Sequence, residues 1–397
     1  MKAIENKWWA PLGIEQLHKQ IQDHKLSYEE MQENGFPVGD RNNPGKVILT
    51  ANPIFADSLN PQKQICRCGK ELSLLEEGWY LDEDGCKYHP GKRNFIVGQN
   101  KVSYSCCKRD LSSEGCTHSK YHVSFLRPFQ DVHFVQTECK INSRRDALTN
   151  VFALDCEMAF TTKGMEVVRV TLVNVYGIVV YDSYVKPEHQ ILDYNTAYSG
   201  VNRNNLDGVD TTLQRVQSFL LNLLNKDSIL VGHGLANDLL GLNLIHESVV
   251  DTSCLFPHDR GFPYKHSLKH LAAIHLGKSI QVSWRGHNSI EDAKTCMELL
   301  LWKIYSKMPF VIMPWSLCPQ NIMPMKYSIS AQNTLFLNSF QIGAFYKILL
   351  TQLKGRNSVP PLLFSSYTAM MKSVPMVPPF YVPSFLPPIF AYNNAKK

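Results

Sequence analysis

The chain has 397 residues, a hydrophobic content of 44%, a charged content of 19% and a formal net charge of +6. This length exceeds one ordinary globular core and predicts a compact domain accompanied by a smaller one. The positive charge is no evidence for nucleic-acid binding, because residues 307–397 carry 8 basic and no acidic side chains, whereas residues 151–306 carry 13 and 16.

The first residues, MKAIENKWWAPLGIEQ, lack the apolar stretch of a secretory signal, so we expect a reducing compartment. In such a compartment the 11 cysteines are metal ligands or core residues rather than a disulfide framework. The composition predicts five segments: an N-terminal extension (1–60), a cysteine- and histidine-rich zinc-binding module (61–125), a linker (126–147), an α/β domain (148–307), and a Pro-rich, acid-free, poorly ordered C-terminal tail (308–397).

The N-terminal extension is polar, with a short helical stretch near Ile14 to Ile21 and then the turn-rich run NGFPVGDRNNPG. The module after it has paired thiols and imidazoles: Cys66 with Cys68, Cys86 with His89, Cys106 with Cys107, and Cys116 with His122. Six thiols and two imidazoles suit two tetrahedral sites, so we expect about two structural Zn²⁺ ions. His118 competes with His122 as the last ligand. The alternative, unliganded cysteines, leaves the segment with too little apolar area to fold.

The α/β domain begins with strand-like runs. VFALDCEM is one strand, and VVRVTLVNVYGIVVYDSYV contains two more joined around Tyr176 and Gly177, which predicts three antiparallel strands. Next come the helix TTLQRVQSFLLNLL, the buried strand SILVG, the helix ANDLLGLNLIH, the strand VVDTSCLF and the helix HSLKHLAAIHLG. A last helix is expected after Ser289 as N-cap, burying Ala293, Met297, Leu300, Leu301 and Ile304. This order predicts a mixed sheet flanked by helices.

Four acidic residues lie at the ends of these elements. Asp155 and Glu157 are two apart on a strand, so their side chains share a face. Asp238 and Asp292 fall in the first turns of two helices, where the macrodipole favours a carboxylate. Together they would form an oxygen-rich site for Mg²⁺ or Mn²⁺, and His287 could accept a proton there. Taken singly, each could instead be a strand-end charge, a helix-capping charge or a loop histidine.

The order D-x-E, then NDLL after VGHG, then HNSIED resembles the three motifs of the DEDDh exonuclease superfamily, which has a ribonuclease H-like fold. The connecting text VGHGLANDLLGLNLIHESVVDTSCLFPH and YKHSLKHLA is most similar to the Rex-type RNA exonucleases of eukaryotes, over about residues 148–306. The resemblance implies a nuclear 3′-to-5′ exoribonuclease in RNA processing or turnover that releases nucleoside 5′-monophosphates from a single-stranded 3′ end. The cysteine-rich stretch is similar to CHORD domains and to the metal-binding module of Rex-type proteins.

The resemblance also implies residue roles in two-metal hydrolysis. Asp155 bridges two Mg²⁺ or Mn²⁺ ions, Glu157 and Asp292 help to hold the ion that activates water, Asp238 orients the other ion, and His287 is the general base. The nucleotide pocket is expected to be lined by Met158, His233, His266 and Leu268, although Met158 could equally be a core residue. Arg169 could touch phosphate, but an ion pair on the strand face is the favoured interpretation.

Two alternative functions stay open. One is a catalytically silent, zinc-bearing RNA-binding or adaptor protein; the other is a DNA exonuclease, because no motif marks contacts to a 2′-hydroxyl. The zinc module could bind RNA through basic residues such as Arg67, and either the module or the Pro-rich tail could recruit a protein. The apolar run TLFLNSFQIGAFYKILLTQL contains Lys347 and several amides, so no stable membrane association is expected. A chain beginning at about residue 140 is expected to retain a complete core and site.

Overall fold

The structure is a computed structural model that describes residues 13–43, 46–49, 64–72, 85–91, 93–96, 101–125, 132–140, 147–283 and 286–306. All of these residues fall within the first unit of the chain, Met1–Ser328. The Pro-rich tail predicted from residue 308, with its apolar run, lies outside the described residues. Within the part described, no helix combines the length and apolarity needed to cross a membrane.

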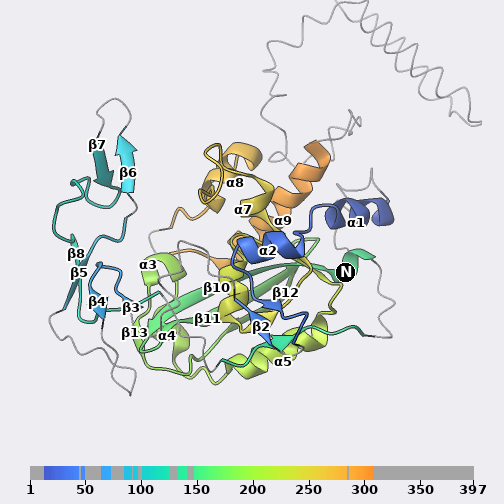
Figure 1. Cartoon of the computed structure of the whole chain (residues 1–397), viewed down its shortest axis with the longest axis horizontal. Helices are drawn as coiled ribbons and strands as arrows, with labels where there is room; N and C mark the ends of the chain where they lie inside the picture. The colour runs from blue at the N-terminus through green and yellow to red at the C-terminus, as the bar shows by residue number, and fades with distance from the viewer. Residues whose placement is uncertain are drawn as a thin grey trace, which may run out of the picture. The chain divides into compact units, whose positions relative to one another are not determined.

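A mixed sheet forms the centre of the first unit (Figure 1). Its strand order is β12 (Val179–Tyr184), β11 (Gly164–Asn174), β10 (Val151–Thr161), β14 (Ile229–Gly232) and β16 (Val249–Asp251). β10, β11 and β12 are antiparallel neighbours, whereas β14 and β16 run parallel to β10. β13 (Ile191–Asp193) pairs with the far end of β10. The mixed sheet with three antiparallel opening strands, predicted from the sequence, is thereby confirmed.

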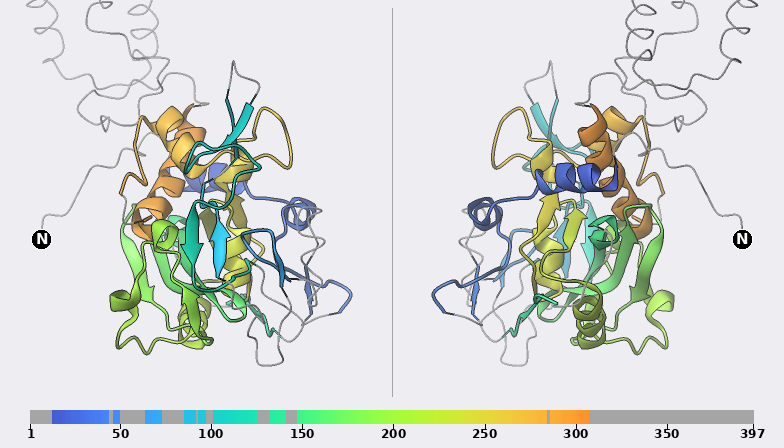
Figure 2. Two further views of the ribbon diagram at one scale, coloured as in Figure 1. Left: turned by 90° about the vertical axis from the view of Figure 1, so that its left-hand side faces the viewer. Right: turned by 90° about the vertical axis from the view of Figure 1, so that its right-hand side faces the viewer.

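Helices cover both faces of this sheet (Figures 1 and 2). Val151 and Ala153 of β10 pack in one core cluster with α8 (Leu268–Leu276) and α9 (Ser289–Ser306). The alternate residues Phe152 and Leu154 pack in a second cluster with α5 (Leu213–Leu223) and α6 (Ala236–Gly241). The strand is therefore buried on both sides, as its almost uninterrupted apolar sequence requires.

The N-terminal segment belongs to the same core. It contains α1 (Ile14–Gln22), α2 (Tyr28–Glu33) and a hairpin of β1 (Val38–Gly39) and β2 (Val47–Ile48). Five of its apolar side chains are fully buried, two in the first cluster and three in the second: Leu17, Ile21, Met31, Phe36 and Val38. This packing overturns the expectation that a chain beginning at residue 140 has a complete core.

Part of the expected linker is also tied to the domain. β9 (Val135–Gln136) pairs in parallel with β15 (Leu244–Ile245), and Thr137 Oγ1 lies 2.8 Å from Nδ1 of the buried His246. β15 replaces the end of the helix predicted from ANDLLGLNLIH, because the chain turns at Asn243 with a φ of 48°. The strand predicted from VVDTSCLF likewise ends at Asp251, whose carboxylate accepts from Ser253 N and caps α7 (Thr252–Leu255).

The remaining elements are short. Ahead of β10 stands the 3-10 helix η2 (Ala147–Asn150), and after β13 come α3 (Thr196–Ser199) and α4 (Arg203–Leu206). The cysteine-rich module forms three small two-stranded sheets: β3 (Gln64–Ile65) with β4 (Glu71–Leu72), β5 (Cys86–Tyr88) with β8 (Thr117–Ser119), and β6 (Arg93–Ile96) with β7 (Lys101–Tyr104). Its buried cluster of Cys66, Leu72 and Cys86 is far smaller than an ordinary core.

Candidate active site

Two of the five predicted catalytic residues lie on the central strand β10. Glu157 is 6% exposed and Asp155 is partly exposed, and both line the same cavity. Thr171 lies directly opposite Asp155 on β11, and its hydroxyl is 2.7 Å from Ser289 Oγ at the start of α9. This buried hydrogen bond sets the first turn of α9 beside the two carboxylates.

Asp238 reaches the same place from the first turn of α6. The backbone N–H of Cys156, between the two acidic residues of β10, donates to Asp238 Oδ1 at 2.9 Å. The turn before α6 is held by the buried carboxylate of Asp251, which accepts from Gly234 N at 3.0 Å and from Leu235 N at 2.9 Å. No role was expected for Asp251, because the predicted strand VVDTSCLF placed it inside a strand rather than at the end.

Asp292 and His287 come from α9 and the loop before it. The helix begins at Ser289, so the capping side chain is Asn288, whose Oδ1 accepts from Ile290 N at 3.2 Å, rather than Ser289 as predicted. Asp292 Oδ2 accepts from Gln281 Nε2 at 2.8 Å and lies 3.7 Å from His287 Nδ1.

Burial and mutual repulsion raise the pKa values of these four carboxyl groups. Burial, followed by the charges of Asp238, Glu157 and Asp292, raises the pKa of Asp155 well above its ordinary value. The pKa of Glu157 is raised to about 9 by burial and by Asp292, and burial raises the pKa of Asp238 to about 7 and that of Asp292 to about 6. A cation placed among them would relieve both costs.

The donor set fits a hard cation. Glu157 Oε1 and Asp292 Oδ1 are buried and have no hydrogen-bond partner among the described residues, which is costly unless another ligand meets them. Carboxylate oxygens are the ligands that Mg²⁺ and Mn²⁺ prefer. The acidic oxygens are spread more widely than a compact single-ion site, since within the described ranges only the two cysteine–histidine groups have all ligand atoms within 4.8 Å.

A cavity of about 230 Å³ opens beside the acidic residues. Its lining includes Met158 and His233, as expected, and His233 Nδ1 lies 2.9 Å from Thr252 Oγ1. His266 and Leu268 are not among the lining residues: Leu268 is 5% exposed in the core, and His266 stacks between His258 and His270. Lining residues that the sequence did not reveal include Asn195, Tyr198, Ser199 and Asn237.

Arg169 is engaged within the sheet. Its Nε and Nη2 donate to the two carboxylate oxygens of Asp182, each at 2.9 Å. The favoured interpretation of Arg169 as a strand-face ion pair is therefore confirmed.

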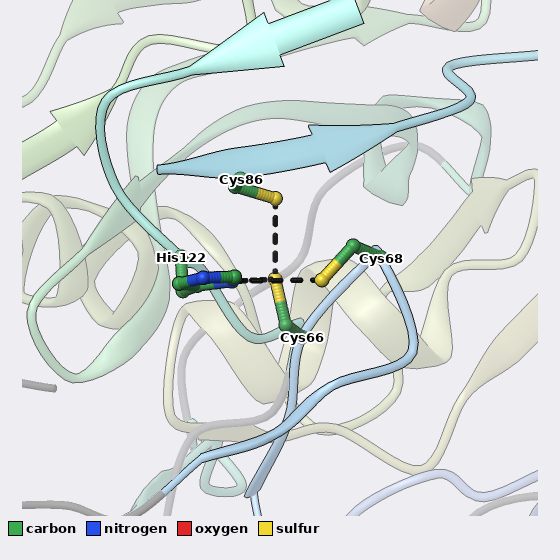
Figure 3. Close-up of side chains that lie close together, drawn as sticks. All are labelled: Cys66, Cys68, Cys86 and His122. Carbon is green, nitrogen blue, oxygen red and sulfur yellow. Dashed lines mark hydrogen bonds between the residues drawn. The ribbon is translucent and has the colours of Figure 1, made fainter. Parts of the chain in front are cut away.

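The eight thiol and imidazole residues singled out in the module gather in two groups of four. Cys66, Cys68, Cys86 and His122 form the first, shown in Figure 3, and His89, Cys106, Cys107 and Cys116 form the second. His118 lies on β8 and belongs to neither group. In the first group the hydrogen bond from Cys86 lowers the pKa of Cys66 to about 4, which favours the thiolate form that binds zinc. Nitrogen and sulfur donors in fours suit tetrahedral Zn²⁺.

Known proteins resemble this chain over the same region. Residues 152–300 match the family model described as Exonuclease. "Exonuclease GOR" of Pan troglodytes is 42% identical over 77% of this chain and 44% of its own length, and "RNA exonuclease 1 homolog" of Homo sapiens is 40% identical over 72% and 24%. The solved Neurospora crassa Pan2 catalytic unit is 26% identical over 44% of this chain and 30% of its own, with a TM-score of 0.36. The chain spans less than half the length of these two curated relatives. Residues 152–300 thus match the exonuclease family, and the chain is similar to the Rex-type RNA exonucleases.

Proposed function

We propose that the chain is a 3′-to-5′ exoribonuclease that hydrolyses a single-stranded RNA end and releases nucleoside 5′-monophosphates. The observation that carries this proposal is the convergence of Asp155, Glu157, Asp238 and His287 at one cavity. Asp292 lies 3.7 Å from His287, and buried oxygens of Glu157 and Asp292 are left without hydrogen bonds among the described residues. RNA is the proposed substrate because relatives at 40% and 35% identity are named "RNA exonuclease 1 homolog" and "RNA exonuclease 3". We propose that this activity serves RNA processing or turnover in the nucleus.

The four carboxylates would hold two Mg²⁺ or Mn²⁺ ions, which when bound neutralise the phosphate and make water a better nucleophile. His287 lines the cavity and accepts the proton of the attacking water. The carboxylate of Asp292, 3.7 Å from His287 Nδ1, stabilises the imidazolium that this transfer creates. Gln281 fixes Asp292 through its hydrogen bond, so the base and its partner keep their orientation.

The nucleotide would be received by Met158 and His233, which line the same cavity as these acids. Met158 is supported from behind, because a Cβ added to Gly241 of α6 would lie 2.7 Å from Met158 Cε. Its polarizable thioether is suited to contact with a base. His233 presents an aromatic ring on which a base could stack.

We also propose that each cysteine–histidine group binds one structural Zn²⁺, and that the module is CHORD-like. Ligands from β5 serve both groups, since Cys86 belongs to the first and His89, one residue after β5, to the second. Two metal ions would thus replace the apolar core that these small sheets lack.

The test uses the purified full chain with 5′-labelled single-stranded RNA and the matching DNA, with and without Mg²⁺. We expect Mg²⁺-dependent stepwise shortening of the RNA and nucleoside 5′-monophosphate as product. Asp155→Asn should abolish it, whereas Asp210→Asn, the same change at a side chain 82% exposed in a surface ion pair, should not. Internal fragments, or equal activity in excess chelator, would contradict the proposal, and faster shortening of DNA would replace RNA as the substrate.

A further inference from the structure

The metal-binding module touches one wall of the candidate active site. That wall is the α3 segment, defined as residues 193–200, which runs from the end of β13 through α3. Asn195, Tyr198 and Ser199 of this segment line the cavity beside the carboxylates. Two contacts connect the segment to the module, one beside each cysteine–histidine group.

The first contact is made by Arg67, which lies between Cys66 and Cys68 of the first group. Its Nη2 donates to Asp193 Oδ2 at 2.6 Å, and the Arg67 side chain is only 7% exposed. The guanidinium lies 3.6 Å from the ring centroid of Tyr88 and 5.3 Å from that of Phe160 on β10. The other oxygen of Asp193 accepts from the backbone N–H of Asn195 at 2.8 Å. The guanidinium of Arg67 is therefore paired within the protein and is not accessible to RNA.

The second contact is made by Tyr198, whose hydroxyl donates to the carbonyl oxygen of Pro90. Pro90 follows His89, a member of the second group. The next residue, Gly91, is pressed against the same group, because a Cβ there would lie 2.3 Å from Cys106 N. The position of the Pro90 carbonyl thus depends on the arrangement of His89 and Cys106.

The α3 segment in turn holds the loop of the candidate base. The backbone N–H of His287 donates to Tyr198 O at 2.8 Å. Gly286, with a φ of 98°, lies so close to the segment that a Cβ would be 2.2 Å from Thr196 O. The rings of Tyr198 and His287 meet edge to face at 6.1 Å. A displacement of the segment would therefore move His287.

We propose that the cysteine–histidine module is a metal-dependent brace of the active site, in which Arg67 and Tyr198 are positioning residues for the α3 segment and His287. This inference rests on the proposed function of the site. Without a cation nothing joins the four ligands of each group, so the turn that carries Arg67 and the carbonyl of Pro90 lose their fixed places. The module then acts on the rate of the chemical step rather than on capture of RNA.

Hydrogen exchange of the full chain tests the brace without any activity measurement. Cys106→Ser should lower the zinc content and speed exchange in residues 193–200 and at the His287 amide. Arg67→Met keeps every ligand, so it should speed exchange in the same segment while zinc content stays constant. Glu114→Gln removes only an exposed ion pair with Lys87 and serves as the matched control, expected to change neither. Unaltered exchange in residues 193–200 in Cys106→Ser that has lost zinc would overturn the brace.

Kinetics on a short single-stranded RNA provide the second test. Tyr198→Phe keeps the ring but removes the hydroxyl, and should lower kcat by about two- to tenfold, the range of one hydrogen bond, with KM unchanged. Cys106→Ser should also lower kcat, and the double variant should be no slower than the slower single variant. Multiplying effects, or effects on KM alone, would contradict the brace and indicate an RNA-binding module. Wild-type protein without Mg²⁺-dependent shortening would refute the nuclease, while the exchange result would still decide the brace.

Discussion

Asp292→Asn should stabilise the protein at pH 8 when no divalent cation has been added, although the carboxylate is part of the proposed active site. Asp292 is 3% exposed, and burial raises its pKa from 3.8 to about 6. At 1.36 kcal/mol per pH unit, this difference corresponds to about 3 kcal/mol of unfolding free energy. Asparagine has nearly the same shape, and its amide oxygen can still accept the hydrogen bond from Gln281.

The advantage of Asp292→Asn should grow as the pH rises. Because the pKa of Asp292 is higher in the folded than in the unfolded chain, its favourable contribution is complete below pH 3.8 and is lost as the pH rises through about 6. Asparagine does not titrate, so the advantage of the variant should be about 3 kcal/mol at pH 8 and about half of that at pH 5. Added Mg²⁺ should reverse the order, since it stabilises only a protein that binds it.

Urea unfolding followed by circular dichroism at both pH values, with and without Mg²⁺, measures these differences. Asp182→Asn, the same substitution on strand β12, is the matched control. Burial opposes ionisation of Asp182, but the hydrogen bonds from Arg169 and Thr171 prevail and lower its pKa, so its removal should destabilise the protein. Asp182→Asn should keep the stabilisation by Mg²⁺. Lower stability of Asp292→Asn than of wild type at pH 8 without cation, or equal stabilisation of both proteins by Mg²⁺, would refute this prediction.

Two further predictions concern metal content and the proton acceptor. The purified chain should carry about two zinc ions; Cys116→Ser should lose at least one, whereas Cys139→Ser, an exposed cysteine outside both groups, should lose none. Folded protein without zinc would contradict this. His287→Ala should slow turnover by roughly 10² to 10⁴ while leaving Mg²⁺ binding intact, and should abolish the rise of rate with pH that wild type shows as the imidazole loses its proton. His270→Ala, which removes an exposed imidazole, is the control. An unchanged pH profile in His287→Ala would show that His287 is not the general base.

The central acids could be found from the sequence because each has a defined position in a periodic element. Asp155 and Glu157 share a strand face by alternation, and Asp238 and Asp292 sit in the first turns of helices. Asn195, in contrast, reaches the cavity from an irregular turn whose φ of 53° gives no periodic pattern. Its place depends on tertiary packing, which local sequence does not encode.

The pairing of distant segments was the other limit. The sequence placed Cys66 and Cys86 among the metal ligands, but the spacing alone could not decide between His118 and His122. In the structure Nδ1 of His122 lies 3.3 Å from Cys66 Sγ, whereas His118 lies on β8 and belongs to neither group. Arg67 looked like a free basic residue because its partner, Asp193, is 126 residues away. The ion pair with this distant partner buries a side chain for which the sequence had left open both an RNA contact and a solvated surface.

The N-terminal helix α1 provides the last prediction, because two of its isoleucines differ in burial. Ile21 is 0% exposed in the core cluster shared with α8 and α9, whereas Ile14, on the same helix, is 48% exposed. Ile21→Ala should therefore lower the free energy of unfolding by about 2 to 5 kcal/mol. Ile14→Ala should change it by no more than about 0.5 kcal/mol. Urea unfolding of the two variants compares the same chemical change in two environments. Removing residues 1–39 deletes five fully buried side chains, a loss comparable to the whole stability of a domain, about 5 to 15 kcal/mol. Such a truncated chain should neither unfold cooperatively nor shorten RNA, and equal costs for Ile14→Ala and Ile21→Ala would show that α1 does not pack on the nuclease domain.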